Sequence, residues 1–168
     1  MCRAAVFWSR GAHLAGIHDA MDSHSDHERA IRGFFDGFTT GVFPDDLFAA
    51  NLLVWTTAGE MSGDHYRLMP KVVKSIFPDG LAFTIDALVL GADRAAAEVR
   101  SEGLQPDGPP YRNRYAFIFG FEGGRISSIA EHFNPLLVPR DLAERMMAAL
   151  QRCLSGGEAT GFRTRART

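Results

Sequence analysis

Residues 111–121, with the sequence YRNRYAFIFGF, constrain the fold more than any other stretch of the chain. Alternate residues of an extended chain lie on the same side, so this segment has two unlike faces. Arg112 and Arg114 lie on one face. The other face is aromatic apart from one asparagine: Tyr111, Asn113, Tyr115, Phe117, Phe119 and Phe121. The pattern predicts a long β-strand, and the EGG that follows predicts a hairpin turn into a last strand.

The spacing of the apolar residues changes at the PDG of residues 78–80. Before it, the sequence predicts helices over 25–40, 45–50 and 64–77, and a β-rich segment at 51–57. Pro70 is expected to kink or split the last of these helices. After it, the sequence predicts strands over 83–89, 95–104, 111–121 and 125–134, and a closing helix over 139–154. This order predicts an α+β fold, with a curved antiparallel sheet and helices on one side.

The length and composition favour one domain. A chain of 168 residues with 46% hydrophobic and 23% charged residues is long enough for a single core. We expect this domain to span residues 23–154, between a flexible extension at 1–22 and a disordered basic tail at 155–168. The net charge of −2 gives no reason to expect a nucleic acid or an anionic membrane as partner.

The cysteines and the N-terminal segment bear on the compartment. Cys2 and Cys153 lie far apart and lack metal-ligand spacing, which indicates a reducing, cytoplasmic environment. Arg10 and His13 interrupt the apolar residues near the N-terminus, so no membrane span is expected there. The sequence has no phosphate-binding glycine loop, nucleophile elbow or zinc spacing, and we therefore expect no cofactor and no metal.

One carboxylate of the last predicted strand stands on an apolar face. Glu131 alternates with Ile129 and Phe133, and a buried carboxylate must be paired or protonated. Arg100 on a neighbouring strand is the expected partner, and Glu102 would reach the same guanidinium. Such a set can divide a general base from a general acid, as the addition of water to a strained ring requires. The alternatives are an ion network that only fixes strand register, or a solvated face.

The same stretches resemble a known family. The pattern Y-x-N-x-Y-x-F-x-F-x-F-x-x-G-x-I, followed by EHFN, is similar to the SnoaL-like branch of the nuclear transport factor 2-like superfamily. That superfamily includes polyketide cyclases, limonene epoxide hydrolases and ketosteroid isomerases. The resemblance covers about residues 26–150. It implies a cystatin-like cone, in which helices and a strongly curved sheet surround a deep pocket, and frequently a homodimer.

The resemblance also implies roles for particular residues. In limonene epoxide hydrolases an arginine bridges two carboxylates, and Arg100, Glu102 and Glu131 match those positions. Glu131 would activate water and Glu102 would protonate the departing oxygen. Trp55 and Thr57 stand where those enzymes hold the water with tyrosine and asparagine.

Asn134 replaces the acid that often ends the corresponding last-strand segment of the hydrolases. Ketosteroid isomerase chemistry is disfavoured, because Phe34 and Thr56 replace its oxyanion tyrosine and its base. Polyketide cyclisation through Glu131 or His132 stays open. The residues expected to line the substrate pocket are Trp55, Thr57, Tyr66, Tyr115, Phe117, Phe119, His132 and Asn134.

The sequence thus predicts a cofactor-independent acid–base enzyme that acts on a small apolar or polyketide-like molecule. Epoxide hydrolysis is the preferred reaction. A SnoaL-like cyclase or isomerase is the first alternative, and a non-catalytic binding or dimerisation module is the second.

Overall fold

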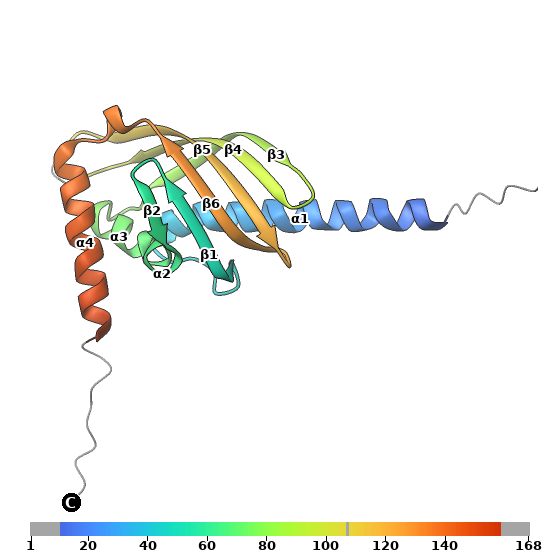
Figure 1. Ribbon diagram of the computed structural model, residues 1–168. Coiled ribbons are helices and arrows are strands. Elements are labelled where there is room, and N and C mark those ends of the chain that lie inside the picture. Colours follow the sequence, from blue (N-terminus) through green and yellow to red (C-terminus); the bar gives the residue numbers. More distant parts are fainter. Residues whose placement is uncertain (1–10, 107, 159–168) are drawn as a thin grey trace, which may run out of the picture.

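A computed structural model describes the backbone of residues 11–106 and 108–158, and the side chains of residues 23–106 and 108–155. Within this part of the chain, six strands form one curved sheet with helices against it (Figure 1). The predicted α+β class is confirmed. Residues 1–10 and 159–168 of the expected extension and tail lie outside the described residues.

The helices and strands follow one another along the chain with short connections. The first half contains α1 (Gly11–Thr40), β1 (Phe48–Thr56), β2 (Gly59–Ser62), α2 (Gly63–Arg67) and α3 (Met69–Ile76). The second half contains β3 (Ala82–Leu90), β4 (Arg94–Gly103), β5 (Tyr111–Glu122), β6 (Arg125–Phe133), the short 3-10 helix η1 (Pro135–Leu137) and α4 (Arg140–Glu158). The strand order across the sheet is β2-β1-β6-β5-β4-β3.

Adjacent strands are antiparallel except for β1 and β6, which run parallel. This parallel pair joins the two halves of the chain, because β6 comes last in sequence and lies between β1 and β5. Figure 1 shows α1 running along one side of the sheet and α4 standing across its end. Helix α4 packs against α3.

The predicted first and last helices are longer in the structure, since α1 begins at Gly11 and α4 ends at Glu158. Two other predicted helices are lost or divided. The helix predicted over residues 45–50 is absent, because β1 begins at Phe48 and a turn closes from Leu47 N to Pro44 O. Leu47 and Phe48 are both buried, so packing overrides the local preference for helix. The helix predicted over 64–77 is split into α2 and α3, and Pro70 is the second residue of α3, where it needs no N–H partner.

The core lies between α1 and the inner face of the sheet, with Phe34 at its centre. The Phe34 side chain is fully buried and has rings around it from α1, from β1 and from β5, including Phe38, Phe48 and Phe119. The end of α1 is held close to the start of β3 at Gly80. A Cβ there would lie 2.5 Å from Thr39 O, and Gly80 has φ of +93°, so the turn requires glycine.

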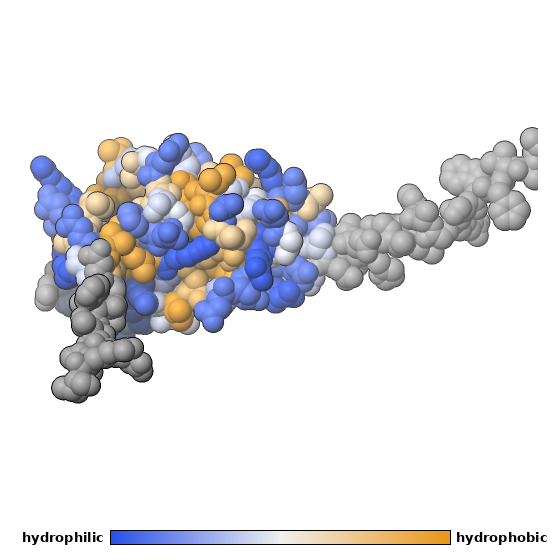
Figure 2. All heavy atoms as spheres, turned by 60° about the horizontal axis from the view of Figure 1, so that its bottom comes forward, coloured by the Kyte–Doolittle hydropathy of each residue, from blue (hydrophilic) through white to orange (hydrophobic). Residues whose placement is uncertain are grey.

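The outside of the molecule is mixed. Seen from below the sheet, hydrophobic residues form patches among hydrophilic ones (Figure 2). No helix among the described residues combines the length and the apolar character needed to cross a bilayer.

Candidate active site

The inner face of β6 places Glu131 inside the fold. Glu131 lies opposite Phe117 of β5 and beside Thr56 of β1, on the side of the sheet that faces the helices. Thr57, just after β1, holds the backbone of β6 around it. The Thr57 amide donates to Glu131 O at 2.9 Å, and the Thr57 hydroxyl accepts from Phe133 N at 3.0 Å. The position of the carboxyl group is therefore fixed by two strands.

The partner of this carboxyl group is Tyr66, which comes from α2. Tyr66 Oη donates to Glu131 Oε2 at 2.9 Å, across 65 positions of the sequence. Ser62 caps α2 by accepting from His65 N, and this cap sets the direction in which the helix presents the buried Tyr66. One hydrogen bond thus joins α2, the short helix that follows the β1–β2 hairpin, to the last strand of the sheet.

Burial dominates the electrostatics of this pair. It raises the pKa of Glu131 to about 7, although the hydrogen bond from Tyr66 opposes the change by stabilising the carboxylate. Burial raises the pKa of Tyr66 well above its ordinary value, and the negative charge of Glu131 adds to this effect. Glu131 keeps some solvent-accessible surface because it borders a cavity, but its carboxyl group is enclosed by protein. Near neutral pH the carboxyl group is therefore present in both its protonated and its ionised form.

Glu131 and Tyr66 line an interior cavity of about 290 Å³. Its wall is almost entirely apolar: besides Phe117 and Phe133 from the sheet, it includes Phe77 from the segment after α3 and Leu142 and Met146 from α4. Glu131 is the one carboxyl group that lines it among the described residues. The polar groups that accompany Glu131 are hydroxyls: Thr56, Tyr66, Tyr111 and Tyr115.

The predicted set of Arg100, Glu102 and Glu131 does not assemble. Arg100 and Glu102 lie on the outer face of β4, where the exposed side chains alternate with buried ones. Arg100 Nε pairs with Asp86 at 2.8 Å, and Glu102 pairs with Arg112 at 2.6 Å. The prediction that these two residues face the pocket is wrong, because the small side chains on the other side of β4 face the core and leave the charges to solvent.

The eight residues expected in the pocket divide into two groups. Tyr66, Tyr115 and Phe117 line the interior cavity. The other five do not line it: Trp55, Thr57, Phe119, His132 and Asn134.

Each of these five has another place in the fold. Trp55 and His132 are in contact on the outer face of the sheet, with ring centroids 4.8 Å apart and the rings tilted by 43°. Phe119 is part of the core, and Thr57 holds the backbone of β6. Asn134 caps η1 by accepting from Leu136 N. Thr56 is at the position that the resemblance matched to the base of a ketosteroid isomerase. Its hydroxyl is hydrogen-bonded within the β1–β2 turn, where it donates to Gly59 O and accepts from Ala58 N.

Sequence reasoning missed two polar residues near the cavity. Tyr111, which lines the cavity, and Asn113 belong to the inner face of β5, as the alternation of residues 111–121 predicted, but they had no assigned role. Tyr111 Oη lies 3.0 Å from Tyr115 Oη, and Asn113 Nδ2 donates to Tyr111 Oη at 3.0 Å. The alternation itself was the signal, since it put all three side chains on the face that carries Phe117.

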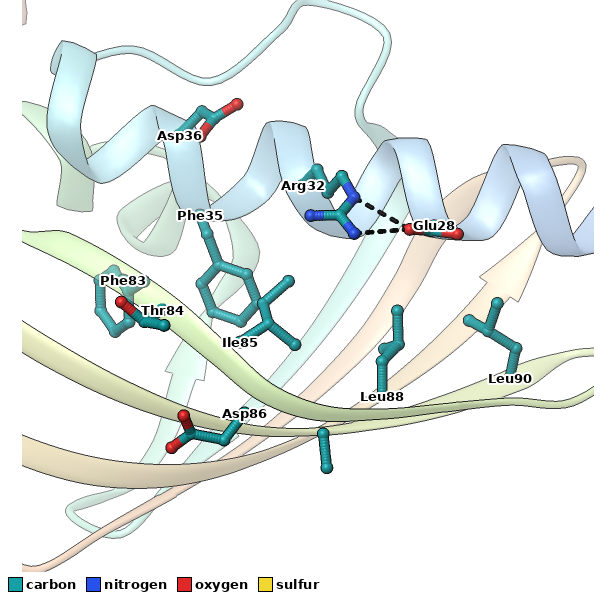
Figure 3. Close-up of a pocket in the computed structure, with 11 residues that line it drawn as sticks. Glu28, Arg32, Phe35, Asp36, Phe83, Thr84, Ile85, Asp86, Leu88 and Leu90 are labelled. Carbon is teal, nitrogen blue, oxygen red and sulfur yellow. Dashed lines mark hydrogen bonds and ion pairs between the residues drawn. The ribbon is translucent and has the colours of Figure 1, made fainter.

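A second, larger groove of about 680 Å³ runs along the surface between α1 and the edge strand β3 (Figure 3). Arg32 lies over it and is paired with Glu28 at 2.6 Å, while Phe35 and Ile85 face each other below. Asp86 points to the other side of β3, toward Arg100. Glu28 and Asp86 of this groove are paired with arginines, whereas the Glu131 carboxyl group is buried in an apolar wall, so the cavity with Glu131 is the better candidate for chemistry. In the described part of the chain, no three His, Cys, Asp or Glu side chains are grouped as a metal site.

Comparisons with known proteins agree with this architecture. Among solved structures, an NTF2-like protein from Anabaena variabilis matches with a TM-score of 0.60 and 21% identity, over 79% of this chain and 96% of that one. A candidate SnoaL-like polyketide cyclase from Jannaschia sp. matches with a TM-score of 0.58 and 14% identity, over 68% and 90%. An LEH-like epoxide hydrolase from M. tuberculosis matches with a TM-score of 0.57 and 12% identity, over 79% and 98%. At such identities the likeness concerns the fold.

Comparison of the sequence with curated proteins gave no significant match. The model of the SnoaL-like domain matches residues 31–129, which is more than half of the chain and ends two residues before Glu131. With the curved sheet, the enclosed cavity and its acidic side chain, this match shows that the chain belongs to the SnoaL-like family.

Proposed function

We propose that the chain is a cofactor-independent enzyme that transfers a proton on a small, largely apolar molecule bound in the interior cavity. Glu131 is the acid–base group. The observation that carries the proposal is the Glu131 carboxyl group, enclosed in an apolar cavity, bonded to Tyr66 at 2.9 Å and with its pKa raised to about 7. A group of this pKa can accept a proton and return it at neutral pH.

The hydrogen bond from Tyr66 gives the two carboxyl oxygens different tasks. Oε2 accepts the hydrogen bond from Tyr66. Oε1 accepts no hydrogen bond from the described residues and is therefore available to a ligand. Tyr66 is too buried to ionise near neutral pH, and it remains a donor that orients the carboxyl group. Glu131 is therefore the catalytic residue, and Tyr66 is a positioning residue.

The number of carboxyl groups favours one reaction class. Water addition by a pair of carboxylates needs a base and an acid in the same cavity, but Glu102 lies outside the sheet, paired with Arg112. A single carboxyl group suits proton transfer at carbon, in which the same group removes a proton and gives it back. We therefore favour cyclisation or isomerisation of the kind that SnoaL-like cyclases represent over hydrolysis by the predicted set of three residues.

Epoxide hydrolysis is the second candidate, in an altered form. Glu131 would take a proton from water as it attacks the ring, and a phenol of the cavity would donate to the ring oxygen. The presence of Tyr115 in the same cavity as Glu131 supports it, as does the fold-level likeness to an LEH-like epoxide hydrolase.

The test measures proton transfer without the natural substrate. The protein is incubated in D₂O with small cyclic and aryl ketones, and loss of protons next to the carbonyl is followed by NMR. A parallel set of epoxides is assayed for diol. We expect exchange in the wild type, a loss of roughly 10²- to 10⁴-fold in Glu131→Gln, and no loss in the matched control Glu102→Gln.

Each other outcome contradicts part of the proposal. Exchange that survives in Glu131→Gln would remove Glu131 as the acid–base group. An equal loss in Glu102→Gln would restore the pair of carboxylates that the geometry disfavours. Diol formation without exchange would select the second candidate. If the folded protein binds the ketones but catalyses neither reaction, the chain is a binding module and the proposed enzyme activity is wrong.

A further inference from the structure

A second polar group lines the interior cavity, and the function proposed above does not use it. The inner face of β5 carries Tyr111, Asn113 and Tyr115 in succession, and all three side chains are buried. The two tyrosine hydroxyls are 3.0 Å apart. In a cavity whose wall is otherwise apolar, this pair is the largest concentration of hydrogen-bonding groups apart from Tyr66 and Glu131.

The amide of Asn113 sets the direction of the hydrogen bonds. Its Oδ1 accepts from Arg114 N at 2.8 Å, which assigns the nitrogen to the other side of the amide group. That nitrogen donates to Tyr111 Oη and to Asn134 O, at 3.0 Å each. Asn113 thus has both amide protons in use, and it acts on Tyr111 only as a donor.

A count of protons shows that the tyrosine pair has one to spare. Two phenols carry two protons, and the bond between the hydroxyls uses one of them. Tyr111 Oη already accepts a hydrogen bond from Asn113. If Tyr111 in turn donates to Tyr115, the hydrogen bonds run in one direction and each strengthens the next, so this arrangement is favoured. The proton of Tyr115 is then the spare one. The buried Ser101 Oγ lies beside it on β4 and lowers the pKa of Tyr115 against the larger effect of burial, as a donor to the phenol oxygen does, so the Tyr115 proton stays available.

The sheet register places Tyr115 at a useful distance from Glu131. Glu131 lies directly opposite Phe117, and Tyr115 is two residues before Phe117 on the same face. Such diagonal neighbours lie roughly 7–8 Å apart, with their Cβ atoms somewhat closer. Both side chains line the cavity, so a small molecule can contact both at once.

We propose that Tyr115 donates a hydrogen bond to an oxygen atom of the ligand, while the carbon of the ligand that loses its proton lies against Glu131. Tyr111 and Asn113 are positioning residues, since they act on the ligand through Tyr115. The inference rests on the proposed proton transfer. It adds that the ligand carries an uncharged acceptor oxygen, a carbonyl, a short distance from the carbon that loses its proton.

The chemistry of the step requires such a donor. When Glu131 Oε1 takes the proton from carbon, the electron pair of the broken C–H bond moves onto the carbonyl oxygen. The cavity holds no cationic side chain among its described lining residues, so a hydroxyl must stabilise the new charge. Burial keeps Tyr115 protonated by raising its pKa far above the ordinary value, and the neighbouring Tyr111 adds to this effect. Glu131 then returns its proton to carbon or oxygen, and no oxidant or reductant is needed.

The experiment separates oxygen binding from proton transfer by using a ketone without removable protons. Affinities for benzophenone and for diphenylmethane, which lacks the oxygen, are measured by titration calorimetry. The carbonyl stretch of bound, carbonyl-¹³C benzophenone is recorded by infrared difference spectroscopy. We expect the wild type to prefer the ketone and to lower its stretching frequency. Tyr115→Phe should reduce the preference roughly fivefold, the size of one neutral hydrogen bond, and remove the frequency shift.

The controls make the two proposals fail separately. Glu131→Gln should keep both the ketone preference and the frequency shift, since it changes the acid–base group alone. Tyr66→Phe removes a different phenol of the cavity and should also keep the shift. Tyr111→Phe should weaken it without removing it.

A frequency shift that persists in Tyr115→Phe would overturn the inference, as would a wild type that binds the two probes equally well or binds neither. Loss of proton exchange in Glu131→Gln, together with an unshifted carbonyl in the wild type, would leave the proposed function standing without this donor.

Discussion

Tyr66 donates a hydrogen bond of 2.9 Å to Glu131 and thereby joins α2 to the last strand of the sheet. The bond favours the ionised carboxyl group, against the larger effect of burial. Removal of the phenol hydroxyl should therefore raise the pKa of Glu131 above 7. In Tyr66→Phe we expect the limb of the pH–rate profile that reports this group to move to higher pH, and ¹³C NMR of the glutamate carboxyl group to give the same direction. An unchanged profile would mean that Tyr66 has no electrostatic influence on Glu131.

The raised pKa of Glu131 makes the stability of the fold depend on pH. Between pH 4.5, the ordinary value, and about 7, the folded chain holds a proton that the unfolded chain has lost. The free energy of unfolding that this group contributes is complete below pH 4.5 and is lost as the pH rises through 7. The loss is about 3 kcal/mol. Urea unfolding from pH 4.5 to 8 should show the decline in the wild type relative to Glu131→Gln, whose side chain cannot ionise. Parallel curves for the two proteins would contradict it.

The ion pairs on the outer face of β4 should contribute little to stability. The side chains of Arg112 and Glu102 are 70% and 56% exposed, and such pairs are typically worth less than about 1 kcal/mol. Glu102→Gln should therefore change the free energy of unfolding by less than about 1 kcal/mol and leave proton exchange intact. A large loss of stability in urea would show that this face is covered in the native assembly.

Phe34 should be the most sensitive position of the core. It has no exposed surface and has aromatic rings from α1, β1 and β5 around it. Phe34→Ala should cost about 3–5 kcal/mol, a large share of the stability of an ordinary domain. Val42→Ala, at a side chain that is 60% exposed, should change it by less than about 0.5 kcal/mol. Thermal unfolding followed by circular dichroism compares the two, and a similar cost for both would contradict the core described here.

The expected homodimer stays a prediction, and the outer face of β1, β6 and β5 is where we expect it. Leu53, Trp55 and Ile118 are 70%, 42% and 42% exposed, and Trp55 and Ile118 both neighbour Ala130 of β6. Contiguous apolar surface of this kind often marks an interface. Sedimentation should give a dimer for the wild type and a monomer for Leu53→Glu. Val89→Glu, on the edge strand β3, should stay dimeric. A monomeric wild type would end the prediction.

The alternation of residues settled which side chains share a face, but it could not say which face is concave. It correctly placed Tyr111, Tyr115 and Phe117 together on β5, and Glu131 with Ile129 on β6. For β4 the same rule allowed either face to be the inner one, and the expectation that Arg100 and Glu102 lie on the inner face is wrong. The charged residues on neighbouring strands were the overlooked signal, since Asp86 and Arg112 provide opposite charges for Arg100 and Glu102 on the outside.

The true partner of Glu131 was beyond the reach of strand patterns. Tyr66 was expected in the pocket, but its contact with Glu131 depends on the position of α2 after the β1–β2 hairpin, which no local spacing encodes. The family resemblance supplied the curved sheet and the pocket. It also implied a catalytic set of Arg100, Glu102 and Glu131, which the structure does not bring together.

Two of the walls of the cavity are attached differently to the rest of the fold. Glu131, Tyr115 and the Thr57 contacts belong to a continuous hydrogen-bonded sheet, whereas the wall made by Leu142, Ala143 and Met146 belongs to α4, which packs against α3. Substitutions in α4 can therefore resize the cavity while the proton-transfer groups keep their geometry. Under the proposed function, catalysis and substrate choice rest on separable parts, so the ligand that this scaffold accepts can be changed by altering a single helix.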